Sequence, residues 1–137
     1  MKVGEVVELL ERDGWVLSRT RGSHRQFKHP TKPGVVTLAG HAQYRDSQGY
    51  TEFNPETGSA QGVMMGTQYT VILEQGEESW GAHVPDLPGC VAAAGTREEA
   101  LSLIREAIVL HIEGLRESGL PVPVPRSEGQ VVDVGAA

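Results

Sequence analysis

The sequence lacks most of the features that mark secreted, metal-bound or membrane-spanning proteins. Cys90 is the only cysteine among 137 residues, so the chain cannot form an internal disulfide. One thiol and five scattered histidines give no metal-ligand spacing, and we expect no metal and no other cofactor. Apolar runs such as 91–94 are far shorter than the roughly 18 residues of a membrane-spanning helix, and no secretory signal precedes them. These absences favour a cytoplasmic protein without a membrane partner.

The length bounds the architecture. A chain of 137 residues permits one ordinary domain or two very small ones and excludes a large nucleotide-binding or barrel enzyme. Hydrophobic residues at 39% and charged residues at 22% are typical of globular proteins. The 17 glycines and 8 prolines exceed what short helices and strands need, which indicates that part of the chain is loop or linker.

The net charge of −6 is unevenly distributed. Residues 1–41 carry a net charge of +3, whereas residues 63–137 carry −7. A basic half tethered to an acidic half indicates either a polyanion-binding surface beside its own electrostatic mimic, or two surfaces that dock together. A chance distribution of so few charges is the third interpretation.

The first half of the chain shows one helical and three strand-like patterns. Val3, Val6, Val7 and Leu10 follow the i, i+3, i+4, i+7 spacing of an amphipathic helix over residues 2–13. Turn signals then separate three apolar or alternating runs, which predict an antiparallel meander with strands at residues 15–19, 23–29 and 34–38.

The second half follows a polar stretch. Residues 42–66 are rich in glutamine, serine, threonine and glycine, and we interpret them as a linker between domains at 1–41 and 67–137. Thr96 and Glu99 form a capping box at the head of a long helix that Gly119 ends. The strands predicted for this half are residues 69–74, 80–84 and 90–93, with a final strand at 130–134.

Two leucines fall outside the core stripe of the long helix. Leu103 and Leu110 give this helix an apolar surface wider than one covering layer usually needs. We therefore expect the second half to form a homo-oligomer through this surface.

His24 is the residue best suited to catalysis, because it opens a strand amid basic side chains. Imidazole accepts or donates a proton near neutral pH, and cationic neighbours hold phosphate, a grouping that suits metal-free RNA cleavage. If Phe27 faces a covering helix, alternation places His24, Gln26 and Lys28 together on an open face. The alternative is an exposed basic strand with an incidental histidine. The candidate RNA-binding residues are Arg21, Ser23, Arg25, Gln26 and Lys28.

Two family resemblances cover roughly 100 residues. Residues 1–41 resemble the HicA mRNA interferase toxins through Gly14-Trp15, Gly22-Ser23-His24, Phe27, Lys28-His29-Pro30 and the 36–41 segment. Residues 69–125 resemble the HicB antitoxins through the 69–73 strand, Trp80, the 84–90 turn, Gly95-Thr96 and the Glu98-Glu99-Ala100 helix.

The resemblance implies an α+β chain: a double-stranded-RNA-binding-like (dsRBD-like) α-β-β-β unit, followed by a partial RNase H-like β-β-β-α-β domain. It also implies that His24 is catalytic and that the antitoxin covers the surface of the toxin. The chain departs from both families. Residues 42–62 lack the pattern of the second HicA helix, and the twelve residues after Pro125 are too few for the DNA-binding module of many HicB proteins, so we expect no DNA binding.

Our leading hypothesis is a toxin–antitoxin fusion, in which a metal-independent endoribonuclease acting on mRNA is silenced by its attached HicB-like domain. The alternative is a non-catalytic, antitoxin-like binding or assembly protein that carries a degenerate toxin remnant. A linker of about 20 residues spans roughly 25 Å, so contact within one chain and contact between chains both stay open.

Overall fold

The structure, a computed structural model, describes residues 3–40 and 67–135. Its helices and strands are α1 (Val3–Arg12), β1 (Val16–Arg21), β2 (His24–Lys28), β3 (Val35–Ala39), β4 (Ile72–Gln75), β5 (Trp80–His83), β6 (Cys90–Ala94) and α3 (Arg97–Glu117). The ends of these elements lie within two residues of the sequence prediction, except that β4 starts later than expected. The linker predicted at residues 42–66 and His41 lie outside the described residues.

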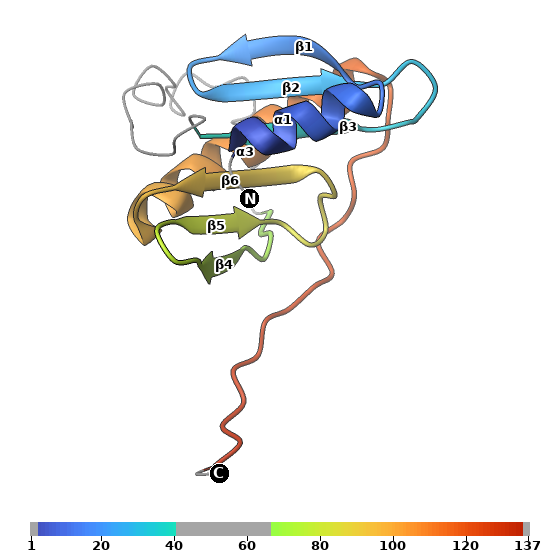
Figure 1. The fold of residues 1–137 in the computed structure, drawn as a ribbon. Helices are drawn as coiled ribbons and strands as arrows, with labels where there is room; N and C mark the ends of the chain where they lie inside the picture. The colour runs from blue at the N-terminus through green and yellow to red at the C-terminus, as the bar shows by residue number, and fades with distance from the viewer. Residues whose placement is uncertain (1–2, 41–66, 136–137) are drawn as a thin grey trace.

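The described strands form one six-stranded sheet in the order β1-β2-β3-β6-β5-β4 (Figure 1). Neighbouring strands are antiparallel, except that β3 and β6 pair in parallel. This parallel ladder places Thr37 opposite Cys90 and Ala39 opposite Ala92. The toxin-like and antitoxin-like strands therefore belong to the same sheet, and the expected α+β class is confirmed.

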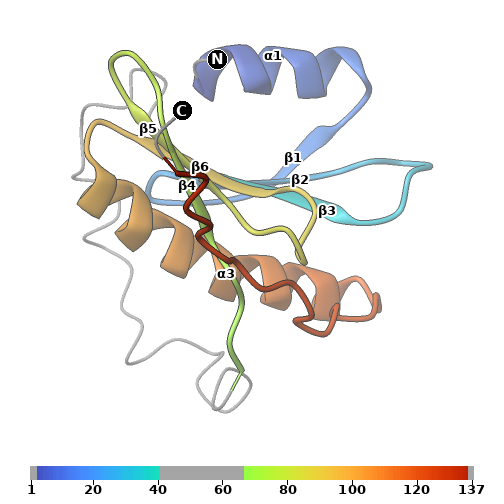
Figure 2. The same ribbon diagram turned by 90° about the horizontal axis from the view of Figure 1, so that it is seen from below.

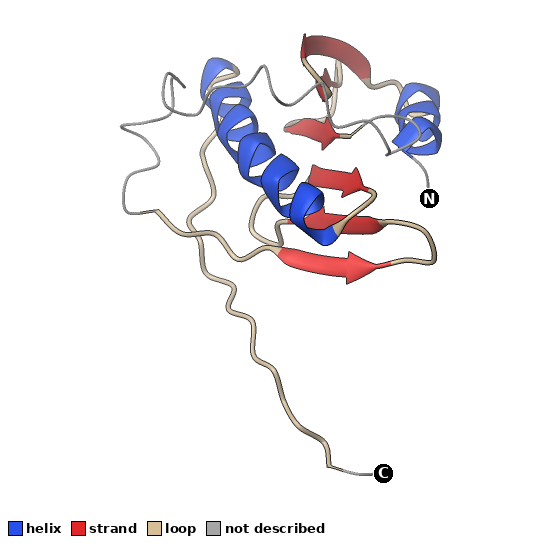
Figure 3. Ribbon diagram, turned by 90° about the vertical axis from the view of Figure 1, so that its left-hand side faces the viewer, coloured by secondary structure: helices blue, strands red, loops and turns tan. Residues whose placement is uncertain are grey.

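Helices α1 and α3 lie on opposite faces of this sheet (Figure 2). Val3 is the one fully buried residue within α1. By contrast, α3 runs along the other face (Figure 3) and contacts strands from β2 to β6. A helix from the second half of the chain thus covers strands of the first half.

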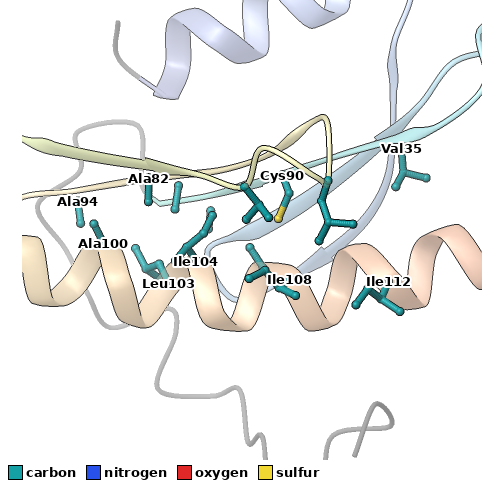
Figure 4. Packing of buried hydrophobic residues seen from close by; sticks show 14 of the residues in the cluster. Val35, Ala82, Cys90, Ala94, Ala100, Leu103, Ile104, Ile108 and Ile112 are labelled. Carbon is teal, nitrogen blue, oxygen red and sulfur yellow. The ribbon is translucent and has the colours of Figure 1, made fainter. Parts of the chain in front are cut away.

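The main hydrophobic core lies between α3 and the sheet (Figure 4). Ile104 and Ala107 of α3 are fully buried, and Val35 and Ala39 of β3 belong to the same cluster as Cys90 of β6. Because this cluster includes residues from both halves, hydrophobic burial stabilises their association.

Local sequence signals determine where α3 begins and ends. The Thr96 hydroxyl accepts a hydrogen bond from the Glu99 backbone N–H at 3.2 Å, as the predicted capping box requires. After Ser118, Gly119 adopts a φ of 72°, a left-handed conformation that ends the helix.

Two glycines allow β3 and β6 to approach each other. Gly40 has a φ of 117°, and a side chain there would overlap the carbonyl oxygen of Ala93. At the other end of the ladder, a Cβ on Gly89 would lie 2.8 Å from the Val35 carbonyl oxygen. Glycine is therefore required at both ends of the joint between the two halves.

The prediction of a final strand at residues 130–134 is wrong, because no strand follows α3 within the described residues. Asp86 accepts hydrogen bonds from the backbone N–H groups of Arg126 and Ser127 at 2.9 and 2.8 Å. These bonds fix the chain where it leaves the body, and Val131 beyond them is 93% exposed (Figure 1). Three alternate prolines before this point cannot donate ladder hydrogen bonds. Among the described helices, none is long and apolar enough to cross a membrane.

Candidate functional site

Strand β2 presents two different faces. His24 and Gln26 pair with Ala39 and Thr37 of β3 and point toward α3, whereas Phe27 lies on the opposite face. The predicted separation of Phe27 from His24 and Gln26 is therefore confirmed. Strand alternation alone predicted an open face for His24, but α3 covers it. This cover agrees with the expectation, from the HicB resemblance, that the antitoxin half lies over the toxin surface.

His24 is only 1% exposed beneath α3. Its Nε2 atom lies 3.3 Å from the Leu103 carbonyl oxygen and 3.5 Å from Oε2 of Glu106. Burial lowers the pKa of His24 and raises the pKa of Glu106 to about 7, because desolvation disfavours the charged form of each group. The imidazole has the proton-transfer chemistry expected of a catalytic group, but in this arrangement it is closed to a substrate.

A buried polar network lies next to His24. The Gln26 side-chain amide donates to the Leu110 carbonyl at 2.5 Å and to the Thr37 hydroxyl at 3.2 Å. The same hydroxyl lies 2.8 Å from Nδ1 of His111, which is 1% exposed. Burial lowers the pKa of His111 to about 4. The network joins β2 and β3 of the toxin-like half to α3.

Arg19 is a site residue that the sequence analysis missed. Its guanidinium pairs with Glu117 and lies 3.6 Å from Oε1 of Glu113, both on α3. The pairing register of β1 shifts between Leu17 and Arg19, so that Arg19 lies opposite Gln26 and Arg21 lies opposite His24. No glycine or proline in β1 indicates this irregularity in the sequence.

A second stripe on α3 explains these contacts. Leu103, Glu106, Leu110, Glu113 and Glu117 recur at i, i+3, i+7, i+10 and i+14, the spacing of one helix face. Leu103 and Leu110 are 4% and 2% exposed, so the argument for an oligomer from these leucines is wrong: both are buried within the chain. The spacing of the glutamates with the leucines was the signal that could have identified the toxin-facing side.

The other predicted site residues are divided between the faces of β2. Arg21 is exposed beside His24, and Ser23 is buried. Lys28 is half-buried and, by strand alternation, shares the face of His24. Arg25 pairs with Thr20 and Leu38 and lies on the opposite face. Within the described ranges, no group of three or more histidine, cysteine, aspartate or glutamate side chains is placed to hold a metal ion.

Comparison with known proteins identifies both halves of the chain. A family model described as a HicA toxin of bacterial toxin–antitoxin systems matches residues 3–45. A second model, described as a HicB-like antitoxin of the same kind of system, matches residues 69–134. No solved structure matches the chain.

Curated relatives match parts of the chain. It is 38% identical over 55 residues to an uncharacterized 14.9 kDa protein of Haemophilus phage HP1, covering 40% of this chain and 41% of that protein. It is 32% identical over 71 residues to Antitoxin HicB 2 of Photorhabdus laumondii, covering 51% of each. It is 39% identical over 62 residues to a UPF0150 protein of Thermoplasma acidophilum, covering 44% of this chain and 90% of that protein.

The chain spans about half the length of the phage protein and of the Photorhabdus antitoxin. It covers nearly the whole of the Thermoplasma relative. The chain therefore belongs to the HicB-like antitoxin family through residues 69–134 and to the HicA toxin family through residues 3–45, and it joins the two in one polypeptide.

Proposed function

We propose that this protein is a toxin–antitoxin fusion whose HicA-like half is a metal-independent endoribonuclease held inactive by its HicB-like half. The observation that supports the proposal most strongly is the burial of His24, at 1% exposure, beneath the antitoxin helix α3. A catalytic histidine that its own chain covers cannot reach a ribose or a phosphate. Inhibition then requires no second molecule.

The proposed reaction is attack of a ribose 2′-hydroxyl on the adjacent phosphate, which breaks the bond to the 5′-oxygen of the next nucleotide and leaves a 2′,3′-cyclic phosphate. His24 accepts the proton of the 2′-hydroxyl and returns it to the departing 5′-oxygen. Arg21 and Lys28 share the face of His24 and are suited to bind the RNA backbone, as is Ser23 at the start of the strand. Gln26 would hydrogen-bond RNA only after it leaves Leu110, and Arg25 would contact RNA from the other face. The proposal therefore requires α3 to move before cleavage.

Covalent attachment favours the closed state. Within one chain, β3 pairs with β6 and α3 contacts β2 and β3, so the geometry allows inhibition in cis. An attached inhibitor has an effective concentration on the order of millimolar, so even a weak interface stays closed.

The element order supports finer assignments that we also propose. The α-β-β-β order of the first half suits a dsRBD-like unit, and the β-β-β-α order of the second suits a truncated RNase H-like unit. We place the protein in the cytoplasm with mRNA as its substrate. A homo-oligomer through the HicB-like half now rests on the family resemblance alone.

One observation favours the alternative of a non-catalytic binding or assembly protein. Pairing of β3 with β6 merges the toxin strands with the antitoxin sheet, so the first half shares a core with the second. A toxin that has become part of the antitoxin fold would form such a sheet without any need for cleavage.

RNA cleavage in EDTA by variants of the full chain distinguishes the two functions. Leu110→Lys places a cation in a buried hollow that Arg19, Arg21 and His24 also line, so it should displace α3. Val109→Lys adds the same charge at the adjacent, half-buried position and is the matched control. We expect cleavage by Leu110→Lys alone, and its loss when His24→Ala is added. A folded Leu110→Lys chain that exposes His24 but leaves RNA intact would favour the non-catalytic alternative.

A further inference from the structure

The irregularity in β1 determines where Arg19 points. In a regular antiparallel ladder that continues from the Leu17–Phe27 pair, Ser18 would lie opposite Gln26, and Arg19 would lie on the other face. The register shift instead pairs Arg19 with Gln26 and Arg21 with His24. Bulges of this kind redirect side chains and are frequent beside functional sites. Two arginines thereby join His24 on one face.

Arg19 and His24 each have an acidic partner or neighbour on α3. Glu106 lies 3.5 Å from His24, while Glu113 and Glu117 engage Arg19. Glu106 and Glu113 are two helical turns apart, roughly 10 Å along the axis. The acidic residues of the second stripe therefore lie beside the basic groups along the covered face. This arrangement is expected of a helix that occupies the place of a polyanion.

We infer that Arg19 is a phosphate-binding residue of the RNA site, and that Glu113 and Glu117 occupy the place of an RNA phosphate in the closed state. The inference rests on the proposed function and adds a residue and a ligand group to it. The planar guanidinium of arginine binds carboxylate and phosphate oxygens with the same forked geometry. Arg19 is the diagonal neighbour of His24 on the adjacent strand, about 7–8 Å away, so an RNA whose reacting phosphate lies at His24 can place a neighbouring phosphate at Arg19.

The test measures RNA binding by the full chain with His24→Ala, which prevents cleavage. The probe is a fluorescently labelled single-stranded RNA of about 20 nucleotides, and its anisotropy is followed over a range of salt concentrations. Glu113→Gln with Glu117→Gln removes the competing charges. Gly114→Leu opens the same face by a separate route, because a Cβ at this position already lies 2.7 Å from Gln26. Hydrogen exchange across residues 16–28 reports opening in each variant.

We expect the opened chain to bind RNA roughly tenfold more tightly than the closed chain. Arg19→Gln should remove most of this gain and reduce the salt slope by about 0.7, the value for one phosphate contact on a single strand. Arg12→Gln is the matched control, since it removes the same charge from an exposed position on α1. An opened chain with no gain in RNA binding, or one that loses as much with Arg12→Gln as with Arg19→Gln, overturns the inference.

Failure of this inference is distinguishable from failure of the proposed function. If an opened chain binds RNA through Arg19 but does not cleave it when His24 is restored, the proposed phosphate site stands and the proposed nuclease activity is rejected. If an opened chain cleaves RNA but Arg19→Gln leaves the salt slope of RNA binding unchanged, the proposed nuclease activity stands and the proposed phosphate site at Arg19 is rejected.

Discussion

The side-chain amide of Gln26 occupies the space that a side chain at Gly114 would need. A Cβ added to Gly114 would lie 2.7 Å from both Nε2 and Oε1 of Gln26. Gly114 interrupts the interior of a 21-residue helix, where glycine is less favourable than alanine by roughly 1 kcal/mol. The contact explains this choice: the missing side chain allows α3 to lie against the strand that carries His24.

A double-mutant cycle tests this contact. In the parent chain, Gly114→Ala should lower the free energy of unfolding, because the new methyl group pushes the Gln26 amide from its bonds to Leu110 and Thr37. In a Gln26→Ala background, the same change should raise it by about 1 kcal/mol through helix propensity alone. Urea denaturation of the four chains measures the coupling. Equal effects of Gly114→Ala in both backgrounds would show that α3 does not lie against Gln26 in solution.

The joint between β3 and β6 gives a second prediction. Gly40→Ala should lower the free energy of unfolding by roughly 3 kcal/mol, because its methyl group meets the Ala93 carbonyl and the backbone has a positive φ. Gly34→Ala is the matched control, since Gly34 has a similar φ of 103° with nothing within 4 Å of an added Cβ. We expect this control to cost about 1 kcal/mol from backbone strain alone. Similar losses at the two positions would contradict the close approach of the strands.

The buried carboxyl of Glu106 predicts a pH dependence of stability. Folding raises its pKa from an ordinary 4.5 to about 7, so the folded chain binds more protons than the unfolded chain between these values. The contribution of Glu106 to the free energy of unfolding is therefore complete below about pH 4.5 and is lost as the pH rises to 7. His24 and His111 act in the opposite sense, because their pKa values are lowered by burial.

Glu106→Gln separates the contribution of Glu106 to the pH dependence of stability from that of the histidines. The free energy of unfolding of the variant relative to the parent should increase by roughly 2 kcal/mol between pH 5 and pH 8 and stay constant above that. Urea denaturation at half-unit steps of pH measures the difference. A difference that does not change with pH would mean that Glu106 is ionised and solvated in the folded chain.

Much of the fold followed from local patterns in the sequence. The helical spacing from Val3 to Leu10, the capping box at Thr96 and Glu99, and the turn signals between strands predicted nearly every described element. The exception was the final strand: the valines of residues 130–134 resembled a strand, but Asp86 holds the preceding residues so that the chain leaves the sheet.

The candidate site was only partly predictable. The face of His24 followed from strand alternation, and the family resemblance implied that the antitoxin half covers it. The covering helix itself was not predicted, because it is about 80 residues away in sequence from the strand it covers. Periodicity identified Leu103 and Leu110 as apolar residues outside the core stripe but did not show what they pack against. Arg19 was missed because no residue type signals a change of register.

The most direct test of the central claim is the accessibility of His24 in the intact chain. Diethylpyrocarbonate modifies neutral imidazoles that solvent reaches, and mass spectrometry reports the rate for each histidine. His83 has a side chain that is 44% exposed and provides a reference within the same molecule. We expect His24 to react at least roughly tenfold more slowly than His83 in the intact chain, and to approach its rate in Leu110→Lys. Equal rates for His24 and His83 in the intact chain would contradict the covered site on which the proposed self-inhibition depends.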